Sequence, residues 1–164
     1  MRISLLFLVG FLILAVAQTA YYYGPLPPVV ASHFNGAGQA NGFQSKAAFF
    51  GVYWSVVALT VGIFVPLGLM LRRLPVQMIN LPHKDYWLAP ERSAESLTYL
   101  VRHMEWFAVA TLALLIVIIQ MVLVVNLNGS AVLPPAPTWL ALGGYFVFVF
   151  VWMTNLLRHF GKPS

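Results

Sequence analysis

Four long apolar segments constrain this chain more than any other feature of its sequence. None of them contains Asp, Glu, Lys, Arg or His, and they cover residues 3–20, 47–71, 106–125 and 138–157. The hydrocarbon core of a bilayer is about 30 Å thick, so a helix needs roughly 20 apolar residues to cross it. Each segment comes close to that length or exceeds it, and a helix bonds its backbone amides within itself, as lipid requires. The sequence therefore predicts an all-α membrane protein with four transmembrane helices.

The composition argues against a soluble domain. Of the 164 residues, 60% are hydrophobic and 8% are charged, whereas a soluble domain carries about a quarter of charged residues. Short connections between antiparallel helices favour an up-down bundle. We expect a single transmembrane domain over residues 1–164, folded as a four-transmembrane-helix up-down bundle whose main partner is the lipid bilayer.

The basic residues indicate which side of the membrane each loop faces, because Lys and Arg remain in the cytoplasm more often than they cross. With Met1 inside, the inner side holds eight of the nine basic residues: Arg2, Arg72, Arg73, Lys84, Arg92, Arg102, Arg158 and Lys162. Only Lys46 then lies outside. The sequence therefore predicts both termini in the cytoplasm, an outer loop at residues 21–46 and an inner loop at residues 72–105.

The first apolar segment also fits a cleavable signal peptide. Arg2 precedes an apolar run, and residues 15–17 read Ala-Val-Ala, which is the pattern of a cleavage site. Cleavage would leave three spans. Apolar character continues through Ala20 into three tyrosines at residues 21–23, and tyrosines suit a membrane interface. We therefore expect the segment to be retained as a transmembrane helix.

The second half of the inner loop has a helical pattern. Pro90 suits a first helical position, and apolar side chains follow at positions i, i+3, i+4 and i+7, namely Leu97, Leu100, Val101 and Met104. This stripe predicts an amphipathic helix that either lies on the membrane surface or runs straight into the third span. Residues 126–137 have no charge and three prolines, which predicts a plain connector.

The outer loop carries an ordered set of motifs: Leu26-Pro27, His33-Phe34-Asn35, Gly38, Gly42 and Ser45-Lys46, the last just before a span. In this order the motifs resemble the bacterial membrane family catalogued as domain of unknown function 1648. Residues 80–92 also resemble a segment that follows that domain in relatives. The resemblance implies a multi-span protein of the bacterial cytoplasmic (inner) membrane. The best-known relatives with this domain are immunity and signalling proteins that protect cells from their own Sdp-type toxin.

Eight residues are candidates for binding a peptide or protein partner. Six lie in the outer motif and two in the inner loop: His33, Phe34, Asn35, Gly38, Gly42, Lys46, Tyr86 and Trp87. Structural roles compete with this interpretation. His33 and Asn35 could bond loop backbone, while Gly36, Gly38 and Gly42 supply left-handed turns. Lys46 could extend to the lipid headgroups, and the Tyr86-Trp87 pair could insert into the inner interface.

Other classes of function are disfavoured. We expect no metal and no cofactor, because there is no cysteine and no second His or carboxylate accompanies His33 in the outer loops. Inner carboxylates and histidines show no catalytic spacing, so no catalytic residue is assigned. Nucleic acid is disfavoured as a partner, since the basic residues form no patch. The spans have no charged residue to mark a transport path.

Three hypotheses remain. In the first, a non-enzymatic membrane protein recognises a peptide or protein partner, as immunity or signalling relatives do. In the second, an accessory subunit stabilises a larger membrane complex through its apolar spans. The third, a transporter or membrane enzyme, is the least favoured. The sequence does not determine the oligomeric state.

Overall fold

The structure, a computed structural model, describes residues 2–71 and 73–161, without the side chains of residues 68 and 69. The elements follow in the order α1 (Ile3–Tyr22), β1 (Val29–Phe34), β2 (Ala40–Ser45), α2 (Lys46–Leu71), η1 (Val76–Met78), α3 (Lys84–Trp87), α4 (Ser93–Leu127) and α5 (Pro135–Phe160). Within these residues α1, α2, α4 and α5 are each long and apolar enough to cross a membrane. The prediction of four apolar membrane helices is confirmed to this extent.

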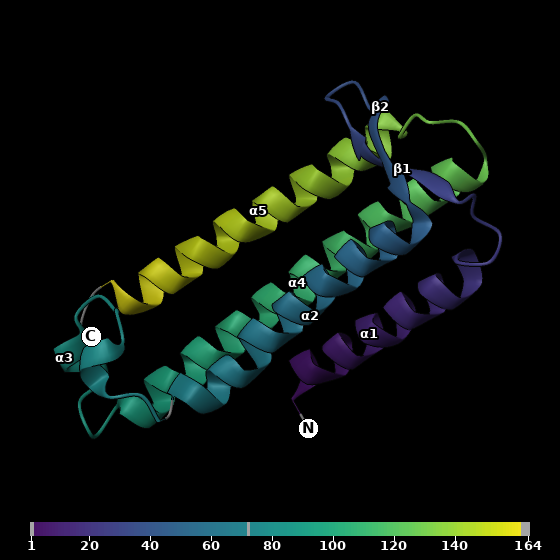
Figure 1. Cartoon of the computed structure of the whole chain (residues 1–164). Helices are drawn as coiled ribbons and strands as arrows, with labels where there is room; N and C mark the ends of the chain where they lie inside the picture. The colour runs from purple at the N-terminus through teal and green to yellow at the C-terminus, as the bar shows by residue number, and fades with distance from the viewer. Residues whose placement is uncertain (1, 72, 162–164) are drawn as a thin grey trace.

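Helix α4 is the centre of the arrangement, because α1, α2 and α5 all pack against it (Figure 1). The main core lies where α1 and α2 meet α4, and it includes Ala15, Tyr53, Val57 and Leu112. Helix α5 is different: none of its most apolar 18-residue stretch is buried inside the molecule, against 33% for α4. The side chains of α5 are therefore available to lipid or to another protein.

Helix α4 runs without a break from the inner loop into the third apolar segment. It has 35 residues with neither Gly nor Pro, so no residue favours a kink. Of the two alternatives for the amphipathic stripe, the continuous helix is correct. Leu97, Leu100 and Val101 pack against the inner loop in a second, smaller core with Leu71 and Leu88. The apolar stripe thus packs against the inner loop, and the helix that carries it continues into the third apolar segment.

The outer segment folds into an antiparallel hairpin of β1 and β2 at one end of the helices, and α3 lies at the other end (Figure 1). Val29 pairs with Ser45 and Phe34 with Ala40, with two irregularities of register around His33. The sequence analysis expected a loop here, because the segment between residues 21 and 46 is rich in the turn formers Gly, Pro and Asn. The β-forming residues Val29 and Val30 sit among those turn formers, and strand pairing depends on contacts that local composition does not reveal.

The loop between α4 and α5 is not the plain connector that its sequence suggested. Gln39 and Val132 form a β-bridge. The Ala40 amide donates to the Ala131 carbonyl at 2.9 Å, and the Leu133 amide donates to the Gly38 carbonyl at 2.8 Å. The loop adds a short third pairing to the edge of the hairpin, so hairpin and loop form one cap over this end of the helices.

Candidate functional site

The turn of the hairpin is organised by Asn35. Its side-chain oxygen accepts hydrogen bonds from the amides of Ala37 at 3.0 Å and Gln39 at 2.9 Å. The backbone of Asn35 also exchanges bonds with Gly38 and Gln39. Asn residues favour such local bonds in turns. The Asn of the His-Phe-Asn motif therefore closes the turn, as its structural interpretation proposed.

Two motif glycines are required for different reasons. Gly38 has φ +80°, and a Cβ there would lie 2.8 Å from the Leu133 carbonyl oxygen. Gly42 would place a Cβ 2.8 Å from the Cβ of His33 across the hairpin. The left-handed turn predicted for Gly38 is confirmed, but the same prediction for Gly36 and Gly42 is wrong, since neither has a positive φ. At Gly42 the requirement is for close approach between strands, which a turn pattern does not signal.

Ser45 and Lys46 join the hairpin to α2. The Ser45 hydroxyl accepts a bond from the Ala48 amide at 3.2 Å, which is an N-cap interaction. The Lys46 ammonium donates to the Leu26 carbonyl at 2.9 Å and lies 4.9 Å from the Tyr23 ring centre. The amine therefore fastens the base of the hairpin to the end of α1, rather than extending to headgroups as the sequence suggested.

Asn126 fastens the hairpin to α4. Its side-chain oxygen accepts a bond from the Ala31 amide at 2.7 Å, and its side-chain nitrogen donates to the Ala31 carbonyl at 2.9 Å. One amide side chain thus takes the place of a neighbouring strand. Ala31 is only 3% exposed, so water does not replace these bonds. Sequence reasoning missed Asn126, because nothing local to it points to a partner 95 residues away.

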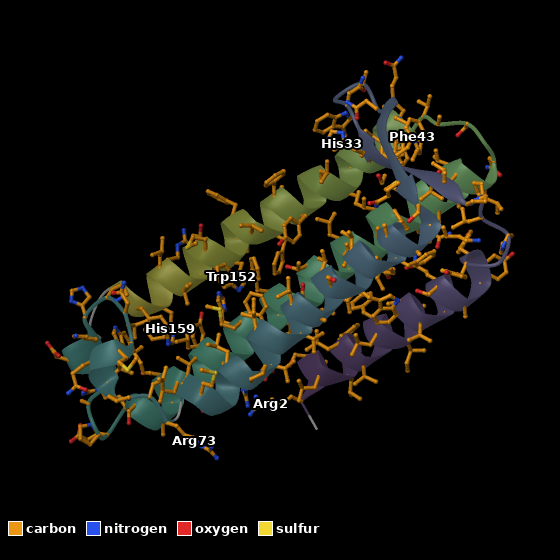
Figure 2. All side chains as sticks on the ribbon, viewed as in Figure 1. Arg2, His33, Phe43, Arg73, Trp152 and His159 are labelled. Carbon is orange, nitrogen blue, oxygen red and sulfur yellow. The ribbon has the colours of Figure 1, made fainter. Side chains whose placement is uncertain are left out.

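The hairpin still presents polar and aromatic side chains to the outside. Phe43 is 61% exposed. The Nδ1 atom of His33 lies 2.5 Å from the Asn41 side-chain oxygen, and both side chains are exposed. His33 thus bonds a side chain across the hairpin, where its structural interpretation expected loop backbone. Figure 2 shows His33 and Phe43 at the hairpin end, far from Arg2, Arg73 and His159 at the opposite end.

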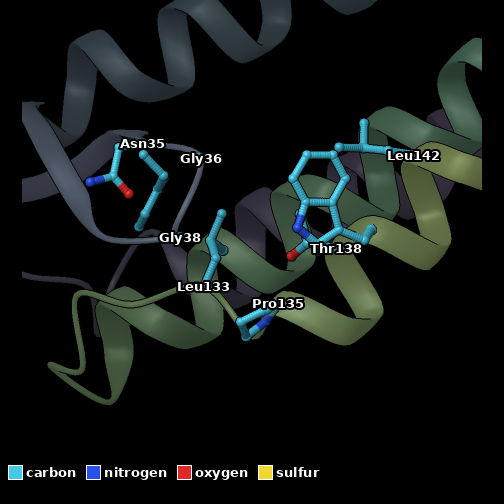
Figure 3. A pocket seen from close by; sticks show the side chains of 9 residues that line it. Asn35, Gly36, Gly38, Leu133, Pro135, Thr138 and Leu142 are labelled. Carbon is cyan, nitrogen blue, oxygen red and sulfur yellow. The ribbon is translucent and has the colours of Figure 1, made fainter.

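A shallow pocket of about 200 Å³ lies between the turn and the start of α5 (Figure 3). Phe34, Asn35 and Gly38 line it from the hairpin. Thr138 and Trp139 line it from α5. Three of the predicted partner-binding residues therefore share one recess with the beginning of the last helix.

A buried polar network lies in the helices beneath the hairpin. The Tyr53 hydroxyl donates to the Gln18 side-chain oxygen at 2.8 Å. The Gln18 nitrogen donates to the Gln120 oxygen at 3.0 Å, and the Gln120 nitrogen donates to the Tyr22 hydroxyl at 2.6 Å. Among the described residues, no buried side-chain N or O atom lacks a partner. The network joins α1, α2 and α4, and the sequence analysis overlooked Gln18 as a member.

Of the two inner candidates, Tyr86 and Trp87, the second contacts the end of α5. The Trp87 indole donates to the Phe160 carbonyl at 3.1 Å, and its ring stacks on that of His159 at 5.3 Å between centres. Tyr86 meets Trp87 edge to face and lies 4.2 Å from the Arg92 guanidinium. Trp87 is half-buried here. Insertion into the inner interface was one structural interpretation of this pair, whereas the observed contacts are within the protein.

The ring contacts continue along α4 and α5. Tyr99 stacks on His159 at 3.6 Å and on His103 at 5.3 Å. His103 and Trp152 are joined twice: each ring nitrogen, His103 Nε2 and Trp152 Nε1, bonds the backbone carbonyl of the other residue, at 2.8 and 2.9 Å. We call Trp87, Tyr99, His103, Trp152 and His159 the inner aromatic cluster. The sequence analysis did not group these residues, because they come from three separate elements.

Histidines and carboxylates, the side chain types that could hold a metal ion, are dispersed among the described residues. Among the described residues, no three His, Asp or Glu side chains gather closely enough to hold a metal ion. His103 and His159 are engaged with rings and carbonyls, and Glu105 is engaged with Arg2 and Ser4.

These features define a class: a multi-span membrane protein whose first two apolar helices are joined by an anchored hairpin. Residues 10–57 match the family described as "Domain of unknown function (DUF1648)". The match begins within α1, covers the hairpin and ends within α2. The recognition of this domain from the motifs is confirmed for residues 10–57. No curated protein and no solved structure has significant similarity to the chain.

Proposed function

We propose that the chain is a non-enzymatic protein of the bacterial cytoplasmic membrane that recognises a peptide or protein partner with its outer hairpin. The observation that carries this proposal is the combination of a firmly anchored hairpin backbone with exposed side chains, Phe43 above all. A surface that is ordered before binding loses little conformational entropy when a partner docks. Exposed aromatic rings supply the contacts that dominate many interfaces.

The proposed arrangement is a four-helix up-down bundle with both termini in the cytoplasm and the hairpin outside. The distribution of charge supports it. At the end with α3 the described residues include five arginines, Arg2, Arg73, Arg92, Arg102 and Arg158. The hairpin end carries Lys46 alone, and this amine is bonded internally. The positive-inside tendency favours the arginine-rich end as the cytoplasmic one.

Immunity or signalling is the form of recognition that the family resemblance suggests. A secreted peptide would meet the hairpin first, since the hairpin is the outermost structured part of this arrangement. His33, Asn41 and Phe43 would then provide hydrogen-bonding and apolar contacts on one small surface. A bound peptide would meet a backbone that is already ordered, because Asn35 closes the turn and Asn126 bonds Ala31.

An accessory-subunit function is the alternative, and α5 is the observation that favours it. Leu140, Phe146 and Phe150 are 76%, 67% and 72% exposed. These side chains form an apolar surface on a helix that has a neighbour on one side only. A second membrane protein could cover that surface, as could lipid.

Site-specific photo-crosslinking in living cells separates the two candidates. A photoreactive amino acid is placed at Phe43 in one strain and at Phe150 in another, with Leu59 on α2, which is 62% exposed, as the lipid-facing control. Recognition by the hairpin predicts a discrete protein or peptide adduct from position 43 that is absent from position 59. An adduct from position 150 alone identifies the chain as a subunit. Lipid adducts at all three positions contradict both.

A further inference from the structure

A pocket of about 300 Å³ lies at the inner end of the bundle, between the start of α1 and α4. Arg2, Ile3 and Ser4 line it from the first helix and the residue before it. Arg102 and Trp106 line it from α4. Two guanidinium groups from elements far apart in the sequence therefore border the same space.

The charges around this pocket leave a positive excess directed into it. Among the described residues, the only carboxylate that bonds a pocket residue is Glu105, which is 4% exposed and points into the α1–α4 interface. There it accepts bonds from Arg2 and, at 2.5 Å, from the Ser4 hydroxyl. The Arg2 side chain remains 43% exposed. The Arg102 guanidinium makes no ion pair or hydrogen bond with another described residue, so its donors are available to a ligand.

An apolar groove of about 680 Å³ continues from the pocket along α1, and Ile3 lines both. The groove follows one face of the helix and is lined by Ile3, Leu6, Phe7, Gly10, Phe11, Ile13 and Leu14. Residues 3–14 rise about 16 Å along the helix axis. One leaflet of the hydrocarbon core is about 15 Å thick. The groove therefore matches the depth of a single leaflet.

Trp106 marks the level of the membrane surface beside the pocket. It is 41% exposed, and its ring lies 5.7 Å from that of Phe7. Tryptophan favours the boundary between headgroups and acyl chains. The cationic pocket is thus at headgroup level, and the groove extends from it into the hydrocarbon.

We propose that pocket and groove together bind one anionic phospholipid. Arg2 and Arg102 hold its phosphate, with the Arg2 guanidinium kept in place by the buried Glu105, and one acyl chain lies along the groove beside Gly10. Guanidinium groups suit phosphate because their donors form a planar fork. Basic pockets between transmembrane helices are a recurrent mode of lipid recognition. The inference depends on the membrane arrangement and is independent of any partner of the hairpin.

Native mass spectrometry tests the headgroup contact. The full chain is reconstituted with phosphatidylglycerol and phosphatidylcholine in equal amounts, and retained lipid is measured for the wild type, for Arg102→Gln and for the control Arg158→Gln. Arg158 is an exposed arginine on α5, away from the pocket. We expect the wild type to retain phosphatidylglycerol selectively. Arg102→Gln should retain about fivefold less of it, which is equivalent to about 1 kcal/mol of binding free energy. Equal retention by all three proteins overturns the proposal.

The groove is tested by filling it. A Cβ added at Gly10 on α1 or at Gly62 on α2 would have no atom within 4 Å, so a larger side chain fits at both without collision. Gly10→Leu should reduce retained phosphatidylglycerol severalfold, while Gly62→Leu leaves it unchanged. Equal effects of the two substitutions overturn the assignment of the acyl chain to the groove.

A separate experiment tests whether the bound phosphate belongs to a lipid or is free in solution. Inorganic phosphate is added to protein in phosphatidylcholine nanodiscs, and the unfolding temperature is compared with that in nanodiscs containing phosphatidylglycerol. Stabilisation by the lipid and not by millimolar phosphate, present in wild type and diminished in Arg102→Gln, supports a lipid ligand. Stabilisation by soluble phosphate alone, or by neither, overturns it. The double variant Arg2→Gln/Glu105→Gln tests Arg2 without leaving the buried carboxylate unpaired, and it should lose lipid retention as Arg102→Gln does.

Discussion

The two ends of this helical structure differ in how much ring stacking accompanies their hydrogen bonds. At the hairpin end, side chains bond backbone atoms: Asn35 closes the turn, Lys46 ties its base and Asn126 clips Ala31. At the opposite end, stacked rings from α3, α4 and α5 form the inner aromatic cluster, in which Trp87, His103 and Trp152 also bond backbone carbonyls through their ring nitrogens. Hydrogen bonds fix distance and direction, whereas ring stacking tolerates sliding. Because stacking supplies a larger share of the contacts at the inner end, we expect the hairpin to be the more rigid of the two ends.

The comparison requires the two ends to lie on opposite sides of the membrane. Labelling of introduced cysteines tests this requirement, and it is the measurement with the largest expected effect. The chain has no cysteine, so single cysteines can be introduced without background. Phe43→Cys should react with a membrane-impermeant maleimide in intact cells, and Glu91→Cys only after the cells are broken. Reaction of Glu91→Cys in intact cells would invert the arrangement and remove the hairpin from the outer side.

Removal of the two hydrogen bonds between Asn126 and Ala31 should have the largest effect on stability. Asn126→Leu leaves the buried amide and carbonyl of Ala31 without partners, which costs about 3 kcal/mol for the two groups. Unfolding in mixed micelles measures the loss, and hydrogen exchange should show faster exchange in β1 and β2. The exposed neighbour Asn128 provides the control, since Asn128→Leu should change stability little.

The turn itself is tested by a matched pair of glycines. Gly38→Ala combines a left-handed backbone with a collision at the Leu133 carbonyl, and we expect a loss of about 2 kcal/mol. Gly36→Ala meets no atom within 4 Å and has no positive φ, so its stability should be close to that of wild type. Equal unfolding midpoints for the two variants would mean that the hairpin is not docked on the α4–α5 loop.

The inner aromatic cluster should respond more weakly to a single substitution. His159→Ala removes the ring that stacks on both Tyr99 and Trp87, and aromatic pairs of this kind contribute about 1 kcal/mol. Spin labels on α4 and α5 should report a broader distance distribution at the inner end, with the hairpin unchanged. A loss of stability in His159→Ala as large as that in Asn126→Leu would contradict the proposed difference in rigidity between the two ends.

The sequence predicted what is determined locally and missed what is determined at a distance. The apolar lengths of the spans are local, because each helix satisfies its own backbone in lipid. The hairpin, by contrast, depends on pairing between β1 and β2 and on Asn126, whose partner is 95 residues away. Gly38 was assigned the correct role because a turn is local, whereas the constraint on Gly42 comes from the opposite strand.

The same distinction explains the inner candidates. Trp87 looks from the sequence like a ring available to a membrane or a partner, since its neighbours give no competing contact. Its hydrogen-bond partner, the Phe160 carbonyl, is 73 residues further along the chain. The sequence position of Arg102 is enough to associate it with lipid phosphates. That Arg2 borders the same pocket cannot be predicted in this way, because it depends on the packing of α1 on α4.

The length and continuity of α4 have a mechanical consequence. Its 35 residues extend about 52 Å, and they contact the hairpin through Asn126 near one end and the aromatic cluster through Tyr99 near the other. Because α4 has no glycine or proline to act as a hinge, we expect it to move as one rigid helix. We therefore expect a sideways displacement of the hairpin to tilt α4 as a whole, so that the contacts of the inner aromatic cluster have to adjust.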